Sequence, residues 1–422
     1  MVQAVRGMRD VLPDEARRWQ TVATAVRKTL LGHSYEEVLL PLLEYTELFA
    51  RGVGESTDIV EKEMYSLEDR DGDSLSLRPE GTAGCVRALQ ENGLLYNQTQ
   101  RVFYHGPMFR YEKPQRGRYR QFTQIGAEVF GLQGPDVDAE LILLAHEFWR
   151  ALDVSDGVRL EINTLGSSGA RQAYRKALVE YLTPHKESLD EDSQRRLVTN
   201  PMRILDSKDR HTQEIVAAAP NLVDFVDEES LQHFSTLQGY LDDMGIGYVV
   251  NPRLVRGLDY YTHTVFEWIT DDLGAQGTVC GGGRYDGLVE QLGGKATPAA
   301  GFGMGLDRLV LLHEAHHGEA DTAPVDVYVC LAEATLMPYA QDVARLIRMA
   351  APAARIRVHM GGGALKKQMK RADTCGAQLA LIIGDQERQA DRLTFKTLAN
   401  GEQFERPTSE AIAKLAQILN TH

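Results

Sequence analysis

The sequence predicts an α+β protein, in which an antiparallel sheet with flanking helices is interrupted by a helical insertion and followed by a C-terminal α/β module. Three patterns lead to this prediction. Short runs of alternating polar and apolar residues, separated by turn residues, occur on both sides of the insertion, as antiparallel strands require. The insertion itself, about residues 168–244, is rich in polar residues, and its apolar residues recur at the spacing of a helix. After Pro324, short apolar runs alternate with amphipathic segments.

The chain has the length and composition of a globular protein with several domains. Its 422 residues correspond to roughly three domains of about 150 residues, and 43% of them are hydrophobic. No apolar run approaches the roughly 20 residues that span a bilayer, and the N-terminus lacks the apolar segment of a secretory signal. We therefore expect a cytoplasmic protein that does not bind membranes.

Net charge and cysteine content limit the partners and the covalent or metal sites that we expect. The formal net charge of −14 argues against indiscriminate binding to nucleic acid. Residues 325–422, however, hold 13 Lys and Arg against 10 Asp and Glu, a net charge of +3, which leaves −17 for the first 324 residues. The C-terminal part is thus the less repulsive surface for a polyanion. Disulfides and a structural zinc site are not expected, because the four cysteines are scattered without a C-x-x-C pair.

The first part of the chain begins with a helix and continues as strands. Apolar residues at helical spacing between Pro13 and Gly32 predict a helix over residues 14–31. A second helix is expected over residues 138–152. Strands are expected at residues 38–40, 74–77, 101–104, 121–130 and 159–163.

After the insertion, strands return and a linker separates the last module. The insertion contains predicted helices over residues 170–182, 191–198 and 231–241. The composition of residues 315–324 is that of a linker between a domain over residues 1–320 and a module over residues 325–422. Further strands are expected at residues 248–251, 263–269, 278–280, 325–331, 355–359 and 379–383, and further helices from about 305 to 312, over 337–349 and over 364–372.

Two tempting motifs are set aside. Residues 313–317 are His-Glu-Ala-His-His, which satisfies the zinc-binding motif H-E-x-x-H. They border the linker, however, and no further histidine follows at the spacing of a third zinc ligand. The glycine-rich stretches at 294–296 and 301–306 lack residues that a Walker or a Rossmann loop needs. We expect no metal site formed by these residues and no dinucleotide cofactor.

The polar residues that remain gather beside strands and glycines. Arg110 and Glu112 precede a basic loop over residues 113–120, and such a cationic loop suits phosphates. On the strand that follows, Gln124 and Glu128 share one face, because side chains alternate along a strand. Each could alternatively be a solvated residue on the outer face of a sheet.

Three later segments continue the same pattern. Residues 256–261 read R-G-L-D-Y-Y, combining a cation, a glycine and two aromatic hydroxyls. Residues 281–286 read G-G-G-R-Y-D and leave backbone open to a ligand. Small residues from 301 lead into a helix that carries Arg308. For each tyrosine the alternative is core packing with a satisfied hydroxyl group.

These segments resemble the motifs of class II aminoacyl-tRNA synthetases. Residues 110–112 with the basic loop are similar to motif 2, residues 301–308 to motif 3, and the strand that ends at Pro41 to motif 1. Within that class, residues 256–261 and 282–288 resemble the two signatures of the histidyl-tRNA synthetase family. The resemblance spans the whole chain and includes residues 6–10 and 77–82.

The resemblance implies a fold, substrates and residue roles. It implies a catalytic domain on a six- or seven-stranded antiparallel sheet, a C-terminal anticodon-binding domain, and a homodimer formed through motif 1. The implied partners are L-histidine, ATP with Mg²⁺, and tRNA(His). Histidine would be bound by Glu80, Gly81, Thr82, Arg110, Gln124, Glu128, Arg256, Tyr260 and Tyr261.

The same resemblance assigns the chemistry to arginines. Arg110 and Arg256 would stabilise charge at the α-phosphate of ATP, and the ATP site would comprise Arg110, Glu112 and Arg308. The acceptor end of the tRNA would meet Gln115, Arg116 and Arg118. The alternative function is that of a regulatory paralogue that senses histidine for ATP phosphoribosyltransferase, and a third is a non-enzymatic RNA-binding protein. The third reading, an RNA-binding protein without enzymatic activity, leaves Glu128 and the tyrosines unexplained.

Overall fold

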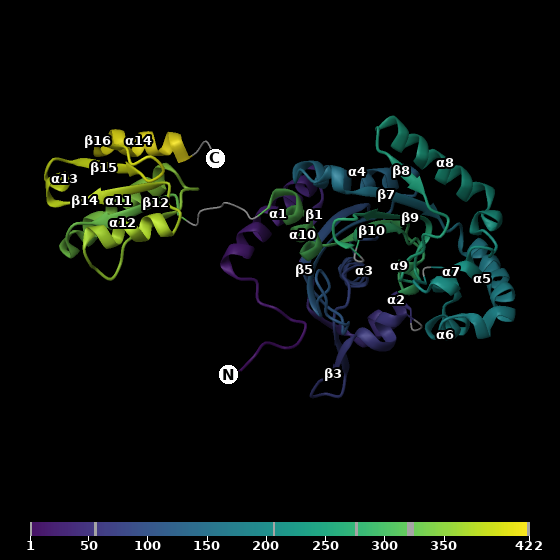
Figure 1. Ribbon diagram of the computed structural model, residues 1–422. Helices are drawn as coiled ribbons and strands as arrows, with labels where there is room; N and C mark the ends of the chain where they lie inside the picture. Colours follow the sequence, from purple (N-terminus) through teal and green to yellow (C-terminus); the bar gives the residue numbers. More distant parts are fainter. Residues whose placement is uncertain (1, 55–56, 206, 275–276, 319–324, 420–422) are drawn as a thin grey trace. The chain divides into compact units, whose positions relative to one another are not determined.

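The computed structural model describes residues 2–54, 57–205, 207–274, 277–318 and 325–419 (Figure 1). It divides into two compact units, Met1–Ala320 and Asp321–His422. The expected linker covers residues 315–324, of which 319–324 lie outside the described residues. In the described part of the chain, no helix combines the length and the apolar character needed to cross a membrane.

The first unit is built on one large sheet, which in the described residues has eight strands in the order β1-β5-β6-β11-β10-β9-β7-β8. Neighbours pair antiparallel from β5 to β7, whereas β1 on β5 and β8 on β7 pair parallel at the two edges. The predicted α+β class is confirmed, and the sheet is wider than the six or seven strands expected. The strands are β1 (Glu36–Glu37), β5 (Gln100–Phe109), β6 (Gln121–Phe130), β7 (Arg159–Thr164), β8 (Tyr248–Val250), β9 (Thr262–Ile269), β10 (Thr278–Arg284) and β11 (Ala299–Gly305).

Two strand predictions differ from the structure. Residues 38–40 form no strand: the chain pairs only over β1 and then leaves the sheet ahead of Pro41, so that the Leu39 side chain is 82% exposed. Conversely, the residues of β11 were not predicted to form a strand but only to lead into a helix, because alanine and glycine rarely favour strands. It lies at the centre of the sheet, where neighbours on both sides supply the hydrogen bonds.

A second sheet packs beside the start of the first. The predicted strand at residues 74–77 is present, but it belongs to this small sheet, ordered β2-β4-β3, and not to the large one. Its strands are β2 (Leu43–Tyr45), β3 (Tyr65–Glu68) and β4 (Ser74–Leu77), and the nearby helices are α2 (Thr46–Val53), the π-helix η1 (Ile59–Glu63), α3 (Thr82–Glu91) and α9 (Leu288–Gln291).

Long helices cover one face of the large sheet. Helix α1 (Pro13–Gly32) starts with a proline and two acidic residues, which suit the free N–H groups of a helix start. Val22, Val26 and Leu30, one turn apart, bury its apolar stripe, and each such side chain contributes about 1.5–3 kcal/mol. The same core includes α4 (Pro135–Ala151), α10 (Leu306–His317) and, after the short η2 (Ser155–Gly157) and β7, helix α8 (Glu228–Asp243).

The helical segment after residue 168 divides between two cores. Asp190 and Asp227 accept hydrogen bonds from the first turns of helices α6 and α8, which explains where these helices begin. Helix α8 packs with α4, whereas the preceding helices pack in the core that contains Tyr260 and Tyr261. These preceding elements are α5 (Ser168–Leu182), η3 (Thr183–Ser188), α6 (Glu191–Thr199), η4 (Pro201–Ile204), α7 (Arg210–Val216) and η5 (Leu222–Phe225).

The second unit is a smaller sheet with helices on both faces. Its strand order is β13-β12-β14-β15-β16, with the first three parallel and the last two added antiparallel. Helices α11 and α14 share one apolar core, and α12 covers the other face. The elements are β12 (Val327–Leu331), η7 (Ala334–Leu336), α11 (Met337–Ala350), β13 (Ile356–Val358), α12 (Leu365–Thr374), β14 (Leu379–Ile383), α13 (Asp385–Gln389), β15 (Arg392–Thr397), β16 (Gln403–Pro407) and α14 (Thr408–Leu419).

Candidate active site

The predicted site residues gather around one cavity of about 940 Å³ in the first unit. Gln115 and Arg116, assigned to the tRNA end, are exposed and do not line it. Glu128 lies beneath its surface and is fully buried. The predicted residues that line the cavity are Glu80, Thr82, Arg110, Glu112, Arg118, Gln124, Arg256, Tyr260, Tyr261 and Arg308.

Glu128 is surrounded by hydroxyl donors. Thr82 Oγ1 donates to Glu128 Oε1 at 2.9 Å, Tyr104 OH donates to the same oxygen at 3.1 Å, and Tyr285 OH donates to Oε2. Burial raises the pKa of Glu128 to about 8 against these donors, which favour the ionised form. Because a carboxylate has about four acceptor positions, three donors leave room on Oε2 for one more N–H group.

Tyr104 and Tyr285 were missing from the predicted site. Tyr285 stands inside the quoted G-G-G-R-Y-D segment, so a signal for it was present. Tyr104 lies on β5 directly opposite Gly126 on β6, and only the strand register reveals that its ring occupies the space above that glycine. The ring of Tyr285 also packs against Tyr260, with centroids 5.4 Å apart.

Glycines in the central strands make room for the site's side chains. A Cβ atom at Gly301 would overlap the Glu128 carboxylate, and one at Gly281 would overlap the Arg256 guanidinium group. A Cβ atom at Gly303 would likewise meet the Gln124 amide. Strands β10 and β11 therefore contain glycines, which have low strand propensity, because side chains from other segments lie directly over them.

Glu80 holds the start of helix α3. Its carboxylate accepts the backbone N–H groups of Thr82 at 2.7 Å and Ala83 at 2.8 Å. Gly81, between Glu80 and Thr82, lies against the Tyr104 ring. Burial raises the pKa of Glu80, although these two backbone donors lower it. Glu80 thus fixes Thr82, whose hydroxyl group points to Glu128.

Arg256 is fixed by an internal carboxylate. It forms an ion pair with Glu267 on β9, and its guanidinium carbon lies 5.6 Å from the centre of the Tyr261 ring. Burial lowers the pKa of Arg256, but the charges of Glu267 and Tyr261 outweigh it and raise the pKa overall. Glu267 carries no local sequence signal: it pairs with Gly281 on β10, and the Arg256 guanidinium group lies over that glycine.

Arg110 and Arg308 are held by carbonyl groups. Arg110 Nε donates to the carbonyl of Pro79 at 2.8 Å. Arg308 Nη1 donates to Thr278 at 2.6 Å, and its Nε donates to Gly117 at 3.1 Å. Burial, together with neighbouring Arg118 and Arg110, lowers the pKa of Arg308 to about 10. Several guanidinium groups thus concentrate positive charge at one end of the cavity.

The basic loop folds back on its own strand. Arg118 forms an ion pair with Glu112, and the backbone groups of Gln115 and Arg118 bond each other at 2.9 and 3.0 Å. These contacts link a residue assigned to ATP with one assigned to the tRNA end. The N-terminal segment supports the loop from outside, where the backbone N–H of Arg120 donates to Gly7 at 2.8 Å.

The insertion clamps the segment over residues 256–261. Arg171 Nη1 donates to the carbonyl of Tyr261 at 2.5 Å, and Asn200 Nδ2 donates to Asp259 Oδ1 at 2.7 Å. Arg203 also reaches the Gly257 carbonyl at 3.4 Å. Sequence reasoning missed these residues, because the insertion was treated as a separate subdomain.

Two of the three histidines in the H-E-x-x-H segment, residues 313–317, have other partners. His316 Nε2 lies 2.9 Å from Asp272, and His317 Nε2 lies 2.8 Å from the Leu152 carbonyl. Over the residues that the structure describes, no three His, Cys, Asp or Glu side chains are grouped so as to hold a metal ion. All four cysteines are free thiols.

Comparisons with known proteins agree with this geometry. A family model described as histidyl-tRNA synthetase matches residues 7–309, and one described as an anticodon binding domain matches residues 326–418. The apo crystal structure of S. aureus histidyl-tRNA synthetase is 33% identical over 99% of this chain and all of that one, with a TM-score of 0.81.

Two more distant structures share the fold. A histidyl-tRNA synthetase from a Nostoc species is 20% identical, with 99% of both chains covered and a TM-score of 0.72. A Bacillus halodurans protein described as an ATP phosphoribosyltransferase regulatory subunit/histidyl-tRNA synthetase is 24% identical over 88% of this chain and 96% of its own, with a TM-score of 0.64.

Proposed function

Because the chain belongs to the histidyl-tRNA synthetase family, a class II aminoacyl-tRNA synthetase family, we propose that it is a histidine–tRNA ligase. It activates L-histidine with ATP to histidyl-adenylate and pyrophosphate, and then transfers histidine to the 3′ end of tRNA(His). One observation carries the proposal: a buried carboxylate with a free acceptor position, Glu128, lies beneath a cavity rich in guanidinium groups.

Histidine recognition follows from that pocket. Glu128 accepts one imidazole N–H and the Tyr261 hydroxyl meets the other ring nitrogen, with Tyr260 beside them. Glu80, Gly81, Thr82 and Gln124 form the wall at the α-amino end. Amino acids without two ring nitrogens are rejected, because they leave these buried polar groups unpaired.

The first step needs no general base, because the attacking group is already ionised. A carboxylate oxygen of histidine attacks the α-phosphorus of ATP, the bond from that phosphorus to the bridging oxygen breaks, and pyrophosphate leaves with its electron pair. Arg110 and Arg256 stabilise the negative charge that develops, from opposite sides, and Arg308 holds the γ-phosphate. Glu112 contacts the adenine end.

The donor set of the cavity fits a magnesium ion bound through the nucleotide. Mg²⁺ takes oxygen ligands, commonly one or two carboxylates together with substrate phosphates. Glu63 lines the same cavity as the arginines and would offer a carboxylate to such an ion. When bound, the ion neutralises charge on the phosphates.

In the second step, a hydroxyl oxygen of the terminal ribose of the tRNA attacks the carbonyl carbon of histidyl-adenylate. The bond from that carbon to the phosphate oxygen breaks, AMP leaves with the electron pair, and the hydroxyl proton is released. Gln115, Arg116 and Arg118, which belong to one loop, meet the acceptor end. Arg118 lines the cavity, and Gln115 and Arg116 are exposed. We assign catalysis to residues 1–320, including the insertion, and anticodon binding to residues 325–422. The net charge of +3 on residues 325–422 supports this division, because RNA is a polyanion.

We also propose that two chains form a homodimer through motif 1. Leu39 and Tyr45, on either side of Pro41, are 82% and 60% exposed, and Leu42 and Leu43 lie partly exposed between them. A contiguous exposed apolar patch of this kind is typical of an interface. Sedimentation equilibrium should give about twice the chain mass of 47.0 kDa, whereas a monomeric mass would contradict the proposal.

ATP–pyrophosphate exchange tests the proposal. With Mg²⁺ present, histidine alone among the amino acids should support exchange, and tRNA(His) should then be charged. Exchange with another amino acid, or none with histidine, overturns the assignment. A histidine-sensing regulatory subunit, the alternative function, would bind histidine without charging tRNA.

A further inference from the structure

A buried ion pair joins the end of strand β10 to helix α4. Arg284, the last residue of β10, donates from Nη1 to Asp138 Oδ1 at 2.7 Å, and both side chains are 1% exposed. Neither residue lines the cavity of the proposed reaction. A buried ion pair is often no more stabilising than apolar residues of the same volume, because both charges lose their hydration. Its use here therefore favours a role in fixing geometry.

The Arg284 guanidinium group makes five hydrogen bonds, which matches its five N–H groups. Besides Asp138, its partners are the carbonyl groups of Leu132 at 2.7 Å and Gly134 at 3.2 Å. Both carboxylate oxygens of Asp286 also accept from it, at 3.2 and 3.4 Å. A side chain that is held from several directions has one position, and it fixes the backbone that carries it.

The next residue along the chain, Tyr285, reaches the proposed histidine pocket. Its hydroxyl group donates to Glu128, and its ring packs against those of Tyr260 and Tyr261. Arg284 meets helix α4 instead, so these two consecutive side chains point to opposite sides of the chain. A shift of Arg284 therefore moves the hydroxyl group that donates to Glu128.

The insertion supplies a further contact, through His233 of helix α8. His233 Nε2 lies 2.7 Å from Asp138 Oδ2, the oxygen that Arg284 does not use. Because a carboxylate only accepts hydrogen bonds, this nitrogen carries the hydrogen. The other face of the contact is formed by His263, whose ring centre lies 5.9 Å from that of His233. Asp138 is thus held by the insertion on one oxygen and holds Arg284 with the other.

We infer that Asp138 and His233 are positioning residues for histidine recognition. They fix Arg284, and Arg284 fixes the Tyr285 hydroxyl group that donates to Glu128. The inference rests on the proposed function, because it takes Glu128 as the group that binds the imidazole ring. It adds that the insertion supports the histidine pocket through two residues that do not touch the amino acid.

Asp138→Asn tests the buried carboxylate. The variant keeps the volume of the side chain but loses the charge that holds Arg284. In pyrophosphate exchange we expect the KM for histidine to rise about tenfold and the KM for ATP to stay within about twofold. Glu140→Gln, which breaks the ion pair of the same helix with Arg101, is the control and should leave both constants within about twofold. An equal rise of both constants in Asp138→Asn overturns the inference.

A double-mutant cycle separates positioning from a general effect on the fold. If Asp138 acts through the Tyr285 hydroxyl group, its replacement has nothing further to remove in Tyr285→Phe. Asp138→Asn should therefore change the KM for histidine less than about twofold in the Tyr285→Phe background. Independent effects would multiply instead, to about a hundredfold for two tenfold losses, and that result contradicts the inference.

His233 provides variants that do not leave a buried charge unpaired, since its side chain is 17% exposed and Arg284 keeps Asp138. His233→Ala removes the donor to Asp138 and should raise the KM for histidine about threefold. His233→Gln should restore most of the loss, because its amide N–H can still donate. His211→Ala, an exposed histidine of the insertion that lies 3.8 Å from Glu214, is the control and should have no effect. An unchanged KM in His233→Ala overturns the inference, also if Asp138→Asn fails to fold.

A spectroscopic signal decides the inference independently of activity. In protein labelled with fluorotyrosine, the fluorine NMR resonance that is missing from Tyr285→Phe identifies Tyr285. Asp138→Asn and His233→Ala should shift this resonance, whereas Glu140→Gln should leave it in place. If the unmodified chain supports no histidine-dependent exchange, the proposed function fails, and this signal still tests the contacts behind Tyr285. A Tyr285 resonance that is the same in all these variants overturns the inference.

Discussion

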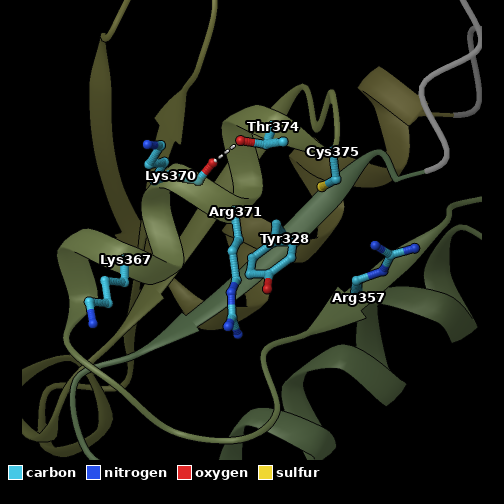
Figure 2. A pocket seen from close by; sticks show the side chains of 7 residues that line it. All are labelled: Tyr328, Arg357, Lys367, Lys370, Arg371, Thr374 and Cys375. Carbon is cyan, nitrogen blue, oxygen red and sulfur yellow. Dashed lines mark hydrogen bonds between the residues drawn. The ribbon is translucent and has the colours of Figure 1, made fainter.

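The two basic hollows of the molecule hold their charges in different ways. In the cavity of the first unit, Arg256 is paired with Glu267, and Arg110 and Arg308 donate to carbonyl groups. The second unit has a hollow of about 490 Å³ whose lining includes Arg357, Lys367, Lys370 and Arg371 (Figure 2). These four cations are exposed and have no carboxylate partner among the described residues. Fixed donors stabilise a transition state without reorganising, whereas free surface charges attract a polyanion and are screened by salt. The comparison therefore supports the proposal that the reaction takes place in the first hollow, where the charged groups are fixed.

The largest expected effect is the loss of Arg256. If its guanidinium group acts on charge that develops only in the transition state, Arg256→Ala should slow adenylate formation about 10²–10³-fold, with little change in KM for ATP or histidine. Lysine should restore only part of the rate, because it lacks the planar fork. Rapid-quench measurement of adenylate formation checks this. A normal chemical rate with a raised KM for ATP would pass the catalytic role to Arg110.

Removal of the second unit should separate histidine activation from tRNA charging. A fragment ending at Ala320 should still exchange pyrophosphate with histidine, provided that it remains folded and dimeric, but charge tRNA on the order of 10²-fold more slowly. Its circular dichroism spectrum and sedimentation serve as controls. Full charging by the fragment would show that the second unit does not anchor the tRNA.

Replacement of Glu128 should affect histidine more than ATP. A buried hydrogen bond to a charged group contributes about 1.5–3 kcal/mol, so Glu128→Gln should raise the KM for histidine roughly 10- to 150-fold. The same variant should be more stable than the unmodified protein at pH 8 and above. The raised pKa means that the folded state holds an extra proton, and the protein loses stability as pH rises from about 4.5 to about 8. An unchanged KM for histidine would contradict the pocket.

The pH profile for histidine should be bell-shaped. If the complex holds one proton between Glu128 and the imidazole, binding must take up a proton above the pKa of about 8 and release one below the imidazole pKa of about 6.5. kcat/KM for histidine should therefore fall up to about tenfold per pH unit outside that window. A profile that stays flat from pH 6 to 9 would count against the shared proton.

The smallest effect concerns the clamp on residues 256–261. Asn200→Ala removes the 2.7 Å bond to Asp259 and should lower the rate of adenylate formation about three- to tenfold through misplacement of Arg256. Asn221→Ala, in the same insertion but at the start of η5, is the control. Equal rates in both variants would mean that the clamp only stabilises the fold.

Sequence reasoning succeeded where a feature is written in neighbouring residues. The helices at 14–31 and 138–152 follow from their own spacing and capping signals, and the arginine and tyrosine motifs of the site follow from short segments. Glu128 was predicted as a site residue because alternation on one strand places it on the same face as Gln124. These features depend on few distant contacts.

The features that were missed depend on pairing between distant strands. Glu267 lies near Arg256 because β9 pairs it with Gly281, over which the Arg256 guanidinium group lies. Tyr104 reaches Glu128 because Gly126 leaves space beside it. Strand β11 contradicts its own propensity, since its glycines are required by side chains from other strands. Likewise the clamp by Asn200 joins residues 59 positions apart. No local pattern predicts such contacts.

The most direct test of the pocket uses the unmodified protein and two modified substrates. If Glu128 and Tyr261 each bind one imidazole nitrogen, methylation of either nitrogen removes a hydrogen bond and adds bulk in a buried site. Pyrophosphate exchange with Nδ1-methylhistidine and with Nε2-methylhistidine should therefore be at least about 10²-fold less efficient than with histidine. Activation of either methylhistidine with the efficiency of histidine would contradict the account.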